Sequence, residues 1–85
     1  MPMQIASEAE REVTRFLVQR PTLEEIAALH ASEEVNARFR ELLEAERERN
    51  LSEEEREEIE AYMYLEHFVR LLKAEAHRQM AQLAS

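Results

Sequence analysis

Three histidines, His30, His67 and His77, are the side chains best suited to metal binding or proton transfer. A di-iron helical bundle needs Glu three residues before each ligating His, but positions 64 and 74 hold Tyr and Ala. The H-E-x-x-H zinc motif is also absent. Glu66 and His67 are adjacent and project about 100° apart on a helix, so they do not share a ligand face. We therefore interpret each histidine as a structural or surface residue and expect no metal or other cofactor.

The Ser, Thr and Tyr hydroxyl groups do not indicate nucleophilic catalysis. The sequence contains no glycine, so the nucleophile elbow, the P-loop and the dinucleotide fingerprint are all excluded. Thr14 and Ser85 have no suitable base beside them, and Tyr62 is better explained as a core or interface anchor. The other hydroxyl groups stand where helices are expected to begin: Ser7, Thr22, Ser32 and Ser52. We expect that the protein is not an enzyme.

The composition predicts an all-α protein. Glu, Ala, Leu and Arg dominate, and all four favour helices. There is no cysteine to form a disulfide, which is compatible with a reducing compartment. We see no signal peptide and no apolar run long enough to span a membrane. We therefore expect a cytoplasmic location.

Residues that cap or break helices divide the sequence into four predicted helices. We expect helices at about residues 7–19, 22–30, 33–49 and 53–83, forming one domain over residues 1–85, with the last two as an αα-hairpin. Three S/T-x-x-E capping boxes mark helix starts, and Ser32 marks another. Pro21 should end the first helix, and Asn50 can adopt the left-handed conformation that caps the third. The boxes pair Ser7 with Glu10, Thr22 with Glu25, and Ser52 with Glu55.

The last helix is too long for a compact chain of this size. Thirty-one residues rise roughly 46 Å, whereas a compact 85-residue chain has a radius of gyration of about 12 Å and a diameter of roughly 30 Å. The third helix, folded back, should cover residues 53–69 only. A seam spaced by three, four and seven residues runs along the last helix and needs cover: Tyr62, Leu65, Val69, Leu72, Ala76 and Leu83.

A second apolar line lies beside this seam and consists of Tyr64, Phe68 and Leu71. The rest of the sequence offers few residues to cover it. We predict that a partner protein or a second copy covers it, because soluble monomers rarely expose such a patch. The alternative is a monomeric bundle whose first two helices wrap across the seam. We predict that the partner is contacted by the apolar side chains of Tyr64, Phe68, Leu71 and Met80 and by the polar side chains of Arg70 and Lys73.

The net charge of −8 argues against general affinity for nucleic acid or for an anionic membrane. Residues 1–66 hold eight Arg and eighteen Glu, and the few charges after them are mostly basic. This asymmetry fits the helix dipole, and a basic docking end is the alternative. Arg70, Lys73 and His77 form a short basic stripe, for which phosphate contact is the less favoured interpretation. The charged run at residues 44–60 is typical of a solvated hairpin tip, with a functional acidic patch as the alternative.

Residues 31–76 resemble a group of small, acidic, all-helical bacterial proteins with no established activity. The resemblance is most specific over "EHFVRLLKA", residues 66–74, and includes "LSEEE" at residues 51–55. Proteins of this kind are often similar to the antitoxin-like members of two-gene modules. Many of them have a glycine where this sequence reads "ERERN", so the turn here must form without glycine.

These observations together predict a protein–protein interaction module that binds through its C-terminal helix. The resemblance implies an antitoxin-like or accessory subunit. A self-associating homodimer without a ligand is the alternative function.

Overall fold

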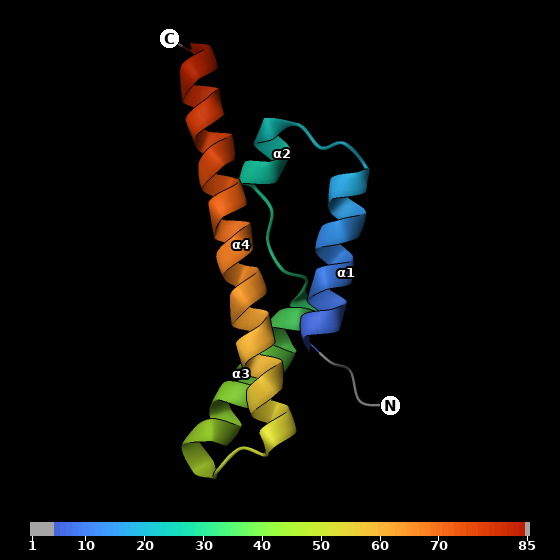
Figure 1. Cartoon of the computed structure of the whole chain (residues 1–85), viewed down its shortest axis with the longest axis vertical. Helices are drawn as coiled ribbons and strands as arrows, with labels where there is room; N and C mark the ends of the chain where they lie inside the picture. The colour runs from blue at the N-terminus through green and yellow to red at the C-terminus, as the bar shows by residue number, and fades with distance from the viewer. Residues whose placement is uncertain (1–4, 85) are drawn as a thin grey trace.

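The computed structural model describes residues 5–84, and this part of the chain is all-helical, as the sequence predicted (Figure 1). The predicted boundaries agree with the observed ones to within three residues. Residues 1–4 and 85 lie outside the described part. The four helices are α1 (Ile5–Val18), α2 (Leu23–Ala27), α3 (Glu33–Glu48) and α4 (Glu53–Ala84).

Helix α4 sets the shape of the molecule. It has 32 residues and is therefore about 48 Å long. The molecule measures 51 × 24 × 18 Å and has a radius of gyration of 15.2 Å, larger than that of a compact chain. The last turns of α4 project beyond the other helices (Figure 1). The predicted mismatch between the helix and the body of the protein is therefore present.

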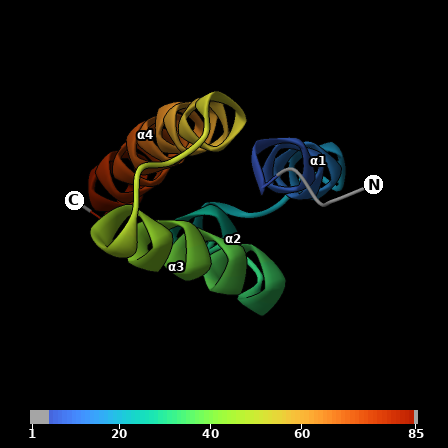
Figure 2. The ribbon, with the colours of Figure 1, turned by 90° about the horizontal axis from the view of Figure 1, so that it is seen from below.

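The other three helices are distributed unequally along α4. α1, α3 and the start of α4 surround a common centre (Figure 2), and α2 packs farther along α4. Phe39 of α3 and Tyr62 of α4 pack at the centre with their ring centroids 4.7 Å apart and their planes tilted by 42°. The monomeric alternative is thus partly realised, because α1 and α2 do cover part of the seam. The buried core consists of Ile5, Ala9, Val35, Leu42, Leu51, Ile59 and Tyr62.

A buried carboxylate joins three of the helices. Glu58 of α4 is only 5% exposed. Its Oε2 accepts a hydrogen bond from the Ile5 backbone N–H at 3.0 Å and another from Arg38 Nε at 3.0 Å, and its Oε1 accepts from Arg38 Nη2 at 3.1 Å. The hydrogen bonds with Glu58 raise the pKa of the Arg38 guanidinium. One side chain therefore ties α1, α3 and α4 together.

The start of α1 corrects the Ser7–Glu10 prediction. The chain is already helical at Ile5, so Ser7 lies inside α1 and is not its N-cap. Ile5 is fully buried, and Glu58 satisfies its free N–H from a distant part of the sequence. A tertiary contact thus binds the first backbone N–H of the described part of α1.

The other predicted helix starts are confirmed. Thr22 Oγ1 accepts from the Glu25 N–H at 3.1 Å, and the Thr22 N–H donates to the Glu25 carboxylate at 2.9 Å. The equivalent distances for Ser52 and Glu55 are 3.1 and 2.9 Å. Ser32 accepts from the Val35 N–H at 3.3 Å. These starts were predictable because both partners lie within one turn of sequence.

Glu12 fastens the start of α3 to α1. Its carboxylate accepts from the Ser32 hydroxyl at 2.6 Å and from the Ser32 N–H at 3.3 Å. Ser32 is therefore both the N-cap of α3 and the point at which α1 holds that end.

The turns form without glycine in two ways. Between α3 and α4, Arg49 takes an extended conformation (φ −158°, ψ 172°) and caps α3 by donating its N–H to the Ala45 carbonyl. Asn50 is not left-handed, so that prediction is wrong; within residues 5–84 the only positive φ belongs to Arg20, at 56°. Arg20 lies two residues beyond the end of α1 and just before Pro21. Its left-handed conformation carries a steric cost for a non-glycine residue.

The charged run at residues 44–60 is mostly exposed, as expected for a hairpin tip. Three of its residues are buried, which the prediction of a solvated tip did not include. Glu58 lies within the run but is buried, as are Leu51 and Ile59. Glu58 turns inward because its position on the helix faces α1 and α3, where Arg38 and the Ile5 N–H compensate the charge.

Replacing Glu58 by Gln should strongly destabilise the fold. The substitution removes the buried charge partner of Arg38 and leaves it only the exposed Glu41. Breaking a buried ion pair costs about 3 kcal/mol. Urea denaturation at neutral pH would measure the change in the free energy of unfolding. The neighbouring Glu57→Gln change is the control, because Glu57 is exposed and its loss should matter by less than about 0.5 kcal/mol. Equal effects of the two changes would contradict the role given to Glu58.

The Glu55 carboxylate should make stability depend on pH in the acid range. Hydrogen bonds from Arg49, at 2.8 Å, and from Ser52 lower the pKa of Glu55 from 4.5 to about 2. Because the folded pKa lies below the unfolded one, the ionised group stabilises the fold above pH 4.5, and this contribution is lost as the pH falls through about 2. Thermal unfolding of Glu55→Gln should show a lower Tm than the unaltered chain at neutral pH and a much smaller difference near pH 2. A difference independent of pH would refute this origin.

Candidate protein-binding surface

One side of α4 carries large apolar side chains that the described chain leaves about half exposed or more. Tyr64, Phe68 and Leu71 are 83%, 49% and 58% exposed, and Met63 beside them is 57% exposed. Tyr64, Phe68 and Leu71 follow the i, i+4, i+7 spacing of one helix face. We call these four residues the α4 apolar face. They belong to a single rigid helix, so their relative positions are fixed.

The seam predicted beside this face turns inward over most of its length. Tyr62 and Ala76 are buried, and Leu65 and Val69 are half-buried against the other helices. Leu83, at the projecting end of α4, is 79% exposed. The residues with the periodicity of the seam therefore face α1 and α2, and the second line faces outward, as the sequence pattern predicted.

The six predicted contact residues fall into two groups. Tyr64, Phe68 and Leu71 lie on the α4 apolar face, and Arg70 is exposed near it with its guanidinium 2.5 Å from Glu66. Lys73 and Met80 are half-buried and belong to the opposite side of α4.

Lys73 is occupied within its own chain. Its Nζ donates to the Leu29 carbonyl, just after α2, at 2.7 Å. The ammonium group therefore clasps the α2 segment to α4. This contact joins residues 44 positions apart, and neither residue shows it in the local sequence pattern.

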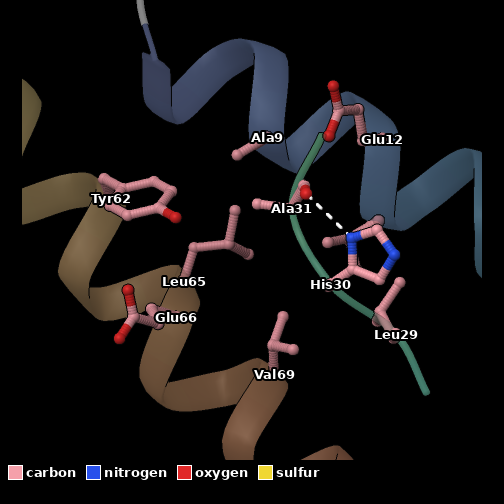
Figure 3. A pocket seen from close by; sticks show the side chains of 10 residues that line it. Ala9, Glu12, Leu29, His30, Ala31, Tyr62, Leu65, Glu66 and Val69 are labelled. Carbon is pink, nitrogen blue, oxygen red and sulfur yellow. Dashed lines mark hydrogen bonds between the residues drawn. The ribbon is translucent and has the colours of Figure 1, made fainter. Parts of the chain in front are cut away.

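A small pocket lies on the inward side of α4. It is enclosed by α1, α4 and the segment that leads from α2 to α3, and it contains about 80 Å³ (Figure 3). Its lining is mainly apolar, with Ala9 and Leu65 facing each other across it (Figure 3). Sites for small organic ligands are several times larger. We interpret it as a packing gap between the helices.

Polar groups at the rim of this pocket do not form a catalytic cluster. His30 lies at the rim and its Nδ1–H donates to the neighbouring Ala31 carbonyl at 3.0 Å (Figure 3). Burial, together with the charges of Glu66 and Glu12, raises the pKa of the Tyr62 hydroxyl. Over residues 5–84, no three His, Cys, Asp or Glu side chains gather closely enough to hold a metal ion.

Removing the Lys73 ammonium should loosen α2. A hydrogen bond to a charged group contributes about 1.5–3 kcal/mol, so Lys73→Met should lower the free energy of unfolding and weaken the α2 segment most. Hydrogen exchange at the Ile26 and Leu29 amides, which donate within this segment, would measure the local effect. Arg70→Met is the control, because Arg70 contacts only Glu66 on its own helix. Unchanged exchange in Lys73→Met would show that the clasp is not needed.

Comparison with known proteins does not assign the chain to a family. The chain matches no protein-family model, no curated protein and no solved structure. Within the described residues, no helix is both long and apolar enough to cross a bilayer. The resemblance to antitoxin-like proteins therefore stays a prediction.

Proposed function

We propose that this protein is an interaction module, an antitoxin-like or accessory subunit that binds a partner protein through the α4 apolar face. Helix-in-groove recognition uses apolar anchors at i, i+4 and i+7, the spacing of Tyr64, Phe68 and Leu71. The observation that carries the proposal is the exposure of these three residues on one face of a helix.

The energetics favour a binding role for this face. Burying one large apolar side chain contributes roughly 1.5–3 kcal/mol, so covering the face from water would be a substantial driving force. Aromatic side chains are also the most frequent anchors in protein interfaces. Val18 and Leu83 are similarly exposed, at 76% and 79%, but each lies at the end of a helix rather than within this face.

The face also does little for the fold itself. Its members are absent from the core cluster, which is built around Ile5, Val35 and Leu42. The face is therefore free to serve an external contact, and changing it should leave the folded chain intact.

Self-association is the second candidate function. A second copy would bring the same apolar residues, and α4 offers a continuous helix for pairing. The mass of the purified chain separates the two candidates, because a homodimer has twice the mass of one chain without any addition.

The double change Phe68→Ser and Leu71→Ser should abolish binding without unfolding the chain. Light scattering would give the particle mass of the purified protein, alone and mixed with extract from its own cells. We expect the unaltered chain to enter a larger particle only in the extract, and the double variant to stay monomeric in both. Because the two residues are exposed, the stability of the variant should change by less than about 1 kcal/mol.

Val18→Ser with Leu83→Ser is the matched control, since it removes equally exposed apolar residues from other places. This control should still join the larger particle. The proposal fails if the unaltered chain stays monomeric in the extract, or if both double variants behave alike.

A further inference from the structure

The α4 apolar face is the C-terminal part of a longer stripe. Counting back from Tyr64 at helical spacing, the same face of α4 passes through Glu60, Glu57 and Glu53. All three glutamates are exposed. The stripe thus changes along the helix from three acids to three large apolar residues, and both parts would meet a partner that lies along α4.

Arg56 is the one base that lines the same surface hollow as the three acids of this stripe. Glu53, Glu57 and Glu60 make no ion pair in the described structure. The basic residues of the second half of α4 are all engaged: Arg70 with Glu66, Arg78 with Glu75, and Lys73 with the Leu29 carbonyl. The Arg78 guanidinium lies 2.5 Å from the Glu75 carboxylate and lowers its pKa.

These charges distinguish between possible occupants. A carboxylate covered by an apolar surface without a counter-charge costs free energy, so a surface that docks along the stripe must supply cations beside the glutamates. A second copy would bring another −8 of charge. On its α4, Arg56 lies among the copy's own glutamates, and Arg70, Lys73 and Arg78 would have to leave their present partners. A basic partner meets the stripe without such rearrangement.

We infer that the partner presents an apolar groove with Lys or Arg along the part of its rim that receives residues 53–60. The inference rests on the proposed function and adds the chemistry and the orientation of the partner. The apolar part of the groove holds Tyr64, Phe68 and Leu71. The basic rim fixes which way α4 lies in it, since only one end of the stripe is acidic.

Two synthetic amphipathic peptides with the same leucine stripe serve as probes, one flanked by lysines and the other by glutamates. Isothermal titration calorimetry with the full chain would measure their affinities at low and physiological salt. The lysine peptide should bind, more weakly as salt rises, and the glutamate peptide should not. Equal binding of the two peptides would overturn the inference.

The triple change Glu53→Gln, Glu57→Gln and Glu60→Gln tests the acidic end of the stripe. It should weaken binding of the lysine peptide by about tenfold, because three ion pairs of modest strength are lost. The matched control changes three other exposed glutamates, Glu10, Glu24 and Glu44, to Gln. It alters the net charge by the same amount. The control should change the affinity by less than about twofold. An equal loss in both triple variants would indicate general charge attraction and would overturn the inference.

Two further outcomes separate this inference from the proposed function. If Phe68→Ser with Leu71→Ser leaves binding of the lysine peptide unchanged, the peptide does not use the α4 apolar face, and the inference is wrong. If the purified chain is a dimer that this double change dissociates, a second copy occupies the face. The basic partner is then overturned, while the role of the face in protein–protein contact stands.

Discussion

The orientation of α4 depends on the buried carboxylate of Glu58. It is held by the Ile5 N–H and by Arg38, so α1 and α3 must lie on the side of α4 from which Glu58 projects. Tyr62, one turn later, turns to the same side and completes the core with Phe39. Because a helix has a fixed period, fixing one side also fixes the opposite side. The inward position of Glu58 therefore determines which residues of α4 are left facing water.

The length of α4 then decides how much of it stays uncovered. α1 and α3 meet its first half, and the short α2, clasped by Lys73, extends the cover on the inward side. Tyr64, Phe68 and Leu71 stay 83%, 49% and 58% exposed in the described chain. The protein is thus a small core with an attached helical rod, and the outward side of that rod joins apolar anchors to acids that make no ion pair in the described structure. This combination favours a binding role and a basic partner.

The sequence predicted what depends on neighbouring residues. The Ser52 capping box was predictable because both partners lie within one turn, and the outward position of Tyr64 followed from helical periodicity. The sequence could not show that Glu58, among many similar glutamates, would be buried, because its partners are 20 and 53 positions away. For the same reason the local pattern predicts Ser7 as a cap, although it lies inside α1. The local pattern also hid the clasp made by Lys73, which the sequence presented as a residue for partner contact.

The central claim is that the outer face of α4 is open to water in the isolated chain while its inner face is closed. A soluble paramagnetic agent, added to a dilute solution of the purified protein, broadens the NMR signals of rings that water can reach. The account predicts strong broadening for Tyr64 and Phe68 and little for Tyr62 and Phe39. Equal protection of Tyr64 and Tyr62 in the isolated chain would contradict it, because that result would mean that the face is already covered.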